Sequence, residues 1–310
     1  MTNSSKWHAP WLLACVAAFA APGVGFACAC GCGVFDVGTA AMFPTHTGGM
    51  LFLEQDFMDQ NQNWSGTASA PAANNGDLGI RTSFWTVGVQ YTIDRRWSAR
   101  LELPYWERRF ITTADNGGPV TFNHRALGDV RLKGVYTGLS EDLSTGITFG
   151  VKLPTGDSTY PNFDPDTEIG SGSTDLLLGA YHLGRLTADN RWSWFTSAQW
   201  QQPLIHKRLY RPGFEIDTAA GVYYGGWRFG NSMRIAPLLQ VAVSYRGHDG
   251  GPMGHPEDSG YVRAFLAPGA ELDVGRTRIY ADVSRAAYTN ASGNQLIART
   301  LFKVNVSVAF

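Results

Sequence analysis

Residues 301–310 read LFKVNVSVAF, and apolar and polar side chains alternate along the stretch. The apolar positions are Phe302, Val304, Val306, Val308 and Phe310, and the polar positions between them are Lys303, Asn305 and Ser307. Successive side chains of a β-strand point to opposite faces of the sheet, so this period of two predicts a strand with one apolar and one polar face. Such a strand fits a barrel wall with lipid outside and a polar interior.

The same alternation recurs along the chain from Gly49 onward. It predicts about twelve strands, each close to the ~10 residues that cross a bilayer at a tilt. The candidate strands cover 50–58, 81–93, 96–111, 124–138, 143–154, 173–187, 191–204, 214–225, 232–246, 260–274, 277–288 and 297–310.

Long and short connections alternate between these strands. The long ones cover 59–80, 112–123, 155–172, 205–213, 247–259 and 289–296, and the short ones cover 94–95, 140–142, 188–190, 226–231 and 275–276. The long ones are rich in Asn, Gly, Ser and Thr, which predicts that they are solvated. Long external loops and short periplasmic turns are typical of outer-membrane barrels. The sequence therefore predicts an all-β fold, a transmembrane antiparallel up-and-down β-barrel with both termini on the periplasmic side.

Composition agrees with a protein that exposes apolar surface to lipid. Charged residues make up 16% of the chain, aromatic residues 13%, and the formal net charge is −1. Soluble domains usually contain about 25% charged residues. The near-zero net charge predicts no nucleic-acid partner. The sequence has no apolar run of about 18 residues, so the only spanning form open to it is a closed barrel surrounded by outer-membrane lipid.

A soluble β-sandwich or barrel is the alternative, because such folds also alternate. The length of the strands and the segregation of the connections by length count against it. Aromatic residues near strand ends also favour the membrane form, since they form interfacial girdles. These residues are Trp85, Tyr91, Trp97, Tyr105, Trp192, Trp194, Trp200, Tyr223, Tyr224 and Tyr245.

The N-terminal part predicts secretion to the bacterial outer membrane. Lys6 precedes an apolar run at 11–21, and small residues surround Ala27. This arrangement indicates a cleaved signal peptide over 1–27, with an N-terminal membrane anchor as the alternative. A flexible segment, 28–48, then leads to the barrel, 49–310. The terminal Phe310 resembles the signal that the barrel-assembly machinery recognises.

Three cysteines, Cys28, Cys30 and Cys32, lie where the mature chain would begin. Alternate thiolates in a Gly-containing segment can bind a soft metal ion such as Cu or Zn. In an oxidising compartment they can instead form a disulfide and leave one thiol free, and lipid attachment at Cys28 is a further alternative. No other cofactor is expected.

The polar strand faces carry charges that this register directs into the lumen. The lumen-lining candidates are Glu54, Asp56, Arg100, Glu102, Asp129, Arg131, Lys133, Lys152, Asp175 and Arg234. Charges in such a place must be hydrated or paired. They either brace the wall as ion pairs or form a constriction that selects permeants.

Catalysis is not expected. His248-Asp249 is similar to the His-Asp pair of omptin-type barrel proteases, but those also use adjacent aspartates, and this chain has no Asp-Asp.

Three motifs follow one another in the middle of the chain: Gly128-Asp129-Val130, then GVKLPTGD at 150–157, then GSGSTD at 170–175. In this order they resemble the meta-pathway of phenol degradation family of outer-membrane transporter-like barrels. The resemblance implies a monomeric barrel and uptake of small, often hydrophobic or aromatic, compounds. As structure, Pro154 suits the point where a strand leaves the sheet, because it lacks an N–H.

The function predicted is therefore an outer-membrane channel or transporter for a small-molecule permeant. The alternative is a non-conducting structural or partner-binding barrel that binds a soft metal ion through its N-terminal cysteines.

Overall fold

The computed structural model describes residues 48–72, 75–114, 116–189, 191–230 and 232–310. These residues form a closed antiparallel barrel of 12 strands with 4 extra strands, which confirms the predicted fold class. The wall consists, in order, of β1 (Gly48–Gln60), β4 (Asp77–Thr92), β5 (Trp97–Thr113), β7 (Arg131–Tyr136), β8 (Thr145–Lys152), β9 (Thr174–Arg185), β10 (Trp192–Ile205), β11 (Glu215–Tyr224), β13 (Met233–Arg246), β14 (Tyr261–Val274), β15 (Thr277–Ile297) and β16 (Thr300–Ala309). The four extra strands are β2 (Gln62–Gly66), β3 (Ala68–Ser69), β6 (Pro119–Leu127), which pairs with the end of β5 beyond β7, and β12 (Trp227–Phe229). The short 3-10 helix η3 (Pro256–Asp258) precedes β14. Among the described residues, no helix has the length and apolar character needed to span a membrane.

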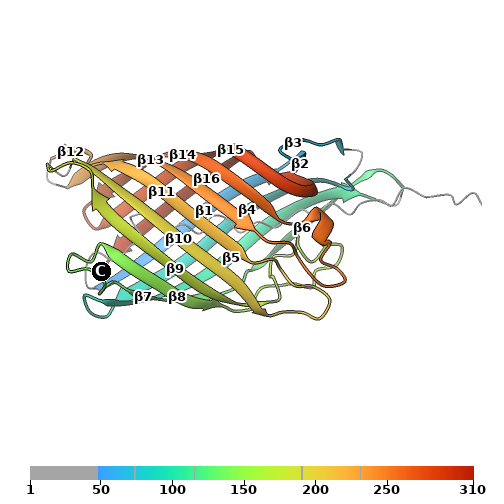
Figure 1. The fold of residues 1–310 in the computed structure, drawn as a ribbon, viewed down its shortest axis with the longest axis horizontal. Coiled ribbons are helices and arrows are strands. Elements are labelled where there is room, and N and C mark those ends of the chain that lie inside the picture. Colours follow the sequence, from blue (N-terminus) through green and yellow to red (C-terminus); the bar gives the residue numbers. More distant parts are fainter. Residues whose placement is uncertain (1–47, 73–74, 115, 190, 231) are drawn as a thin grey trace, which may run out of the picture.

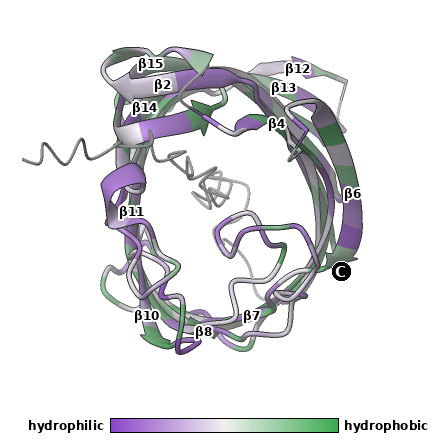
Figure 2. Ribbon diagram, turned by 90° about the vertical axis from the view of Figure 1, so that its right-hand side faces the viewer, coloured by the Kyte–Doolittle hydropathy of each residue, from purple (hydrophilic) through white to green (hydrophobic). Residues whose placement is uncertain are grey.

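The first and last strands close the barrel. Leu53 of β1 is paired with Val306 of β16 on one side and with Val87 of β4 on the other. At the end of the seam, the backbones of Gly49 and Phe310 exchange two hydrogen bonds of 2.9 and 2.8 Å. The strands tilt along the barrel, and the C-terminus lies at the same end as β12 (Figure 1). Viewed down the barrel, the strands form a ring (Figure 2).

Side chains of β16 point alternately outward and inward, as the sequence predicts. Val304 and Val308 are 39% and 41% exposed, whereas Asn305 and Ser307 are 1% and 4% exposed. Hydrophobic and hydrophilic residues alternate along the wall strands (Figure 2). The apolar face is therefore the one that meets lipid, and the polar face lines the lumen.

Aromatic residues gather on the outer face near the short turns. Near the short turns, Trp97 packs on Tyr136 with ring centroids 4.7 Å apart, and Trp192 packs on Tyr224 at 5.2 Å. Such pairs are typical of an interfacial girdle. Tyr223 is an exception to the girdle prediction: it is 8% exposed and packs inside with Phe195, because neighbours along a strand face opposite sides.

Several predicted boundaries differ from the structure. The strand expected at 124–138 is divided into β6 and β7 by a bulge, because two residues of β5, 103–104, lie opposite residues 128–130. The loop expected at 289–296 belongs to β15, whose last residues pair with β2. The loop at 59–80 and the turn at 226–231 contain the short strands β2, β3 and β12.

The register can be tested on two neighbours in β16. Val306→Arg should cost about 2–4 kcal/mol of folding free energy, because it places a charge on the lipid face. Asn305→Arg should cost much less, since Asn305 points inward and donates to Glu54 Oε2 at 3.2 Å, where a carboxylate can accept the charge. Urea titrations of folding into lipid vesicles measure both values. Equal losses would contradict the assignment of inside and outside.

Candidate functional site

The connection between β8 and β9, residues 153–173, packs inside the barrel and is called the lumen loop below. Thr167 and Ile169 are 0% and 2% exposed, and Phe163 packs against Ile80 and Phe110 of the wall. Connections at this end turn inward beside β7 and β8 (Figure 2). The prediction that the long connections are solvated is therefore wrong for this one. β8 itself ends at Lys152, shortly before Pro154, as the missing N–H of proline predicts.

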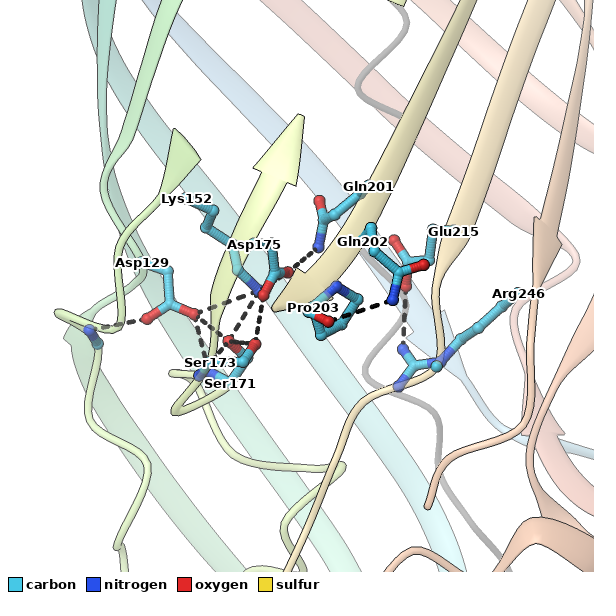
Figure 3. A network of polar contacts seen from close by, with 12 residues as sticks. Asp129, Lys152, Ser171, Ser173, Asp175, Gln201, Gln202, Pro203, Glu215 and Arg246 are labelled. Atoms are coloured by element: carbon cyan, nitrogen blue, oxygen red, sulfur yellow. Dashed lines mark hydrogen bonds and ion pairs between the residues drawn. The ribbon is translucent and has the colours of Figure 1, made fainter. Parts of the chain in front are cut away.

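One carboxylate fastens both ends of the lumen loop. Asp129, in the bulge between β6 and β7, accepts hydrogen bonds from the Gly156 N–H at 3.0 Å, the Ser171 N–H at 2.9 Å and the Ser171 hydroxyl at 2.6 Å. Figure 3 shows these contacts. The two ends approach so closely that a Cβ at Gly170 would lie 2.4 Å from the Gly156 carbonyl. The three motifs singled out in the sequence thus meet in one place, and their glycines allow the backbones to touch.

Lys152 lies beside Asp129 at the base of the lumen loop (Figure 3). Its Nζ is 3.7 Å from Asp129 Oδ2 and 2.7 Å from Asp175 Oδ2, and it donates to the Ser171 hydroxyl at 2.8 Å. Asp175 is fully buried and also accepts hydrogen bonds from Ser173 and Gln201. The burial of these charges is compensated by pairing and hydrogen bonds, as the cost of desolvation requires.

A buried arginine holds the middle of the lumen loop. Arg108 of β5 is 2% exposed, and its guanidinium donates to the carbonyl oxygens of Thr167 and Glu168, the latter at 3.1 Å. Its Nε donates to Thr82 Oγ1 of β4 at 3.1 Å. The sequence analysis missed Arg108, although it lies an even number of residues from Glu102 and so shares the inward face.

All of the predicted lumen residues lie on the inner face, but in four separate ion-pair groups. Glu54 and Asp56 lie 3.2 and 3.5 Å from Lys303. Arg100, Arg131 and Lys133 surround Glu102 at 2.6, 3.9 and 3.4 Å. Asp129, Lys152 and Asp175 form the group described above. Arg234 lies apart, 3.2 Å from Glu271 and 2.6 Å from Asp273.

The lumen loop leaves a narrow cavity of about 100 Å³ against the wall. Its charged lining consists of Glu54, Asp56, Asp129, Asp166, Glu168, Glu215, Arg131, Lys152 and Arg246. Phe84 and Trp106, which also line it, contact each other edge to face at 4.6 Å. A wider space of about 880 Å³ lies at the short-turn end and is lined by Arg95, Arg185, Arg234 and Arg278 together with Asp142 and Glu271.

The carboxylate of Asp249 has a structural role. It accepts hydrogen bonds from the Tyr210 hydroxyl at 3.0 Å and the Gly213 N–H at 2.7 Å, and it is 2.8 Å from Arg246. Arg246 is also 3.1 Å from Glu215 (Figure 3). Asp249 therefore joins the loops at this end of the barrel.

The expected signal peptide and Cys28, Cys30 and Cys32 lie outside the described residues. Within the described ranges, no three His, Cys, Asp or Glu side chains are grouped so as to hold a metal ion.

Comparisons with known proteins concern the fold. No family model matches the sequence, and neither does any curated protein. Among solved structures, an outer membrane channel from Pseudomonas putida F1 matches with a TM-score of 0.66 and 11% identity, over 89% of this chain and 100% of that one. The beta domain of the Bordetella autotransporter BrkA matches with a TM-score of 0.51 and 10% identity, over 86% and 100%. The chain therefore has the fold of outer-membrane β-barrels.

Removing the Asp129 carboxylate should release the lumen loop without unfolding the barrel. Hydrogen bonds to charged groups contribute about 1.5–3 kcal/mol each, so Asp129→Ala should increase opening of the loop at least tenfold. Limited proteolysis within 153–173 measures this opening. Asp189→Ala is the matched control, because Asp189 accepts a backbone hydrogen bond in an exposed turn between β9 and β10. Equal resistance of the loop in both variants would argue against this role of Asp129.

Packing of the lumen loop should also depend on pH through Glu168. Burial raises the pKa of Glu168 from 4.5 to about 7; Asp157 contributes to the rise, while Lys207 and Arg108 oppose it. Protonation therefore favours the packed loop below pH 4.5, and this contribution is lost as the pH rises through 7.

Hydrogen-exchange protection of residues 157–170 should accordingly fall between pH 5 and pH 8 in the wild type. Glu168→Gln should abolish most of that fall, because the amide does not ionise. A pH dependence that is the same in both proteins would show that another group is responsible.

Proposed function

We propose that this protein is a channel that lets small solutes cross the outer membrane, and that it is not an enzyme. The observation that carries the proposal is the lumen loop: side chains of the wall hold it inside a charged lumen, where it leaves a narrow cavity rather than a filled core. A barrel that served only as an anchor would have no need for a charged constriction of this kind. The fold that it shares with the Pseudomonas putida channel is consistent with this role.

The resemblance to the meta-pathway of phenol degradation family extends the proposal to hydrophobic or aromatic solutes. The edge-to-face pair of Phe84 and Trp106 in the cavity lining supports it, since aromatic side chains favour aromatic partners at such distances.

A non-conducting barrel is the second candidate. The small volume of the cavity, about 100 Å³, favours it. In that case the barrel would serve as an anchor for the N-terminal segment, whose cysteines would bind a soft metal ion. Conductance separates the two candidates.

Purified full-length protein in planar lipid bilayers should conduct ions. Arg108→Ala should conduct more than the wild type, because the lumen loop loses the guanidinium that holds Thr167 and Glu168. Arg125→Ala is the control, since Arg125 lies on the exposed face of β6. Absence of conductance in all three proteins would exclude the channel. A normal conductance for Arg108→Ala would mean that the loop does not set the width of the path.

A further inference from the structure

The lumen loop brings acidic groups and no basic group into the barrel. Residues 153–173 read LPTGDSTYPNFDPDTEIGSGS, which contains Asp157, Asp164, Asp166 and Glu168 but no Lys, Arg or His. Asp166 and Glu168 line the narrow cavity. The loop therefore adds negative charge to the lining of the narrow cavity.

Two cations near Glu168, Arg108 and Lys207, offset part of this charge. The ion pairs around the cavity do not offset the remainder. In each of three ion-pair groups that reach the cavity, one basic side chain is shared by two carboxylates. These are Lys303 with Glu54 and Asp56, Lys152 with Asp129 and Asp175, and Arg246 with Glu215 and Asp249. Each group carries one more negative than positive formal charge. Arg131, the remaining basic residue of the lining, belongs to the positive group around Glu102 and offsets only part of the excess.

Glu168 supplies an acceptor that the described chain does not use. The residue is 8% exposed, and its Oε2 has no hydrogen-bond partner among the described residues. A buried carboxylate oxygen without a donor is costly, and more so when it is ionised. A cationic N–H group in the cavity would remove that cost.

Aromatic rings lie beside these carboxylates. Phe84 and Trp106 line the same cavity, and the guanidinium of Arg108 already lies 5.3 Å from the Trp106 ring centroid. Aromatic faces attract cations, and they also accept the apolar part of an organic molecule. The combination of carboxylates and rings suits an organic ammonium ion better than a hydrated metal ion.

We propose that the narrow cavity beside the lumen loop selects small organic cations over anions of the same shape. This inference rests on the proposed channel function and names the class of its permeant. The wider space at the short-turn end, with four arginines and two carboxylates in its lining, has the opposite sign. The charges of this wider space affect selection less, because water and salt screen them. In the narrow cavity, the low dielectric constant of the surrounding protein strengthens the electric field of the charged side chains.

Three probes that share one ring test this proposal: benzylammonium, benzyl alcohol and benzoate. Full-length protein in lipid vesicles is exposed to each at pH 8, where Glu168 is mostly ionised. Benzylammonium should enter about tenfold or more faster than benzoate, within the range that electrostatic focusing gives. Asp166→Asn and Glu168→Gln should each lower that ratio. Glu257→Gln should leave it unchanged, because the side chain of Glu257 is 67% exposed outside the wall.

The possible outcomes separate the two proposals. Equal entry of benzylammonium and benzoate, or faster entry of benzoate, would overturn the cation proposal and leave the channel intact. Fast entry of benzyl alcohol alone would also overturn it and support uptake of neutral aromatic compounds. Failure of all three probes, together with absence of conductance, would refute the channel itself. If Glu168→Gln does not fold, Asp166→Asn still tests the contribution of the loop.

Discussion

Lipid cannot donate or accept hydrogen bonds, and this constraint determines the rest of the molecule. Every backbone group of a membrane-spanning strand must find its partner in a neighbouring strand, so the sheet has to close. Closure is achieved where β1 pairs with β16 along Leu51–Val308 and Leu53–Val306. Once the wall is closed, the period of two assigns the two faces to different environments: one face meets lipid and is apolar, and the other is enclosed and carries the ion pairs described above. The ion pairs of the lumen follow from that separation.

The bulge at residues 128–130 attaches the lumen loop to the barrel wall. It places Asp129 where one carboxylate can accept from Gly156 and Ser171, at the two ends of the lumen loop. The ammonium group of Lys152, at the end of β8, then offsets the negative charges of Asp129 and Asp175. A loop that would otherwise extend into solvent is thereby fixed across the lumen, and its contacts with Arg108 complete the arrangement.

The wall could be predicted from the sequence because its signal is local. Alternation in β16 alone indicates which residues face lipid, and the lengths of the connections indicate the topology. The lumen loop could not be predicted, because Asn, Gly, Ser and Thr are as common in solvated loops as in this packed one. Its position depends on Arg108, 59 residues before Thr167, and on Asp129. The motifs around Asp129 marked the place, but they did not show that it lies inside the barrel. Tyr223 illustrates a smaller error: proximity to a strand end suggested the girdle, whereas its parity places it in the lumen.

The difference between wall and loop also bears on where selectivity can reside. A wall charge such as Glu102 is surrounded by Arg100, Arg131 and Lys133 from its own and the adjacent strand, so its removal leaves buried cations without compensation. Such residues are constrained by stability before they can respond to a permeant. Asp166 and Glu168 lie outside the strand ladders, and Arg108 of the wall holds the loop at Glu168 through its backbone carbonyl. Changes to these two side chains leave the contact between Arg108 and the loop backbone in place. Under the proposed channel function, the lumen loop is therefore the part of the barrel best able to determine what passes.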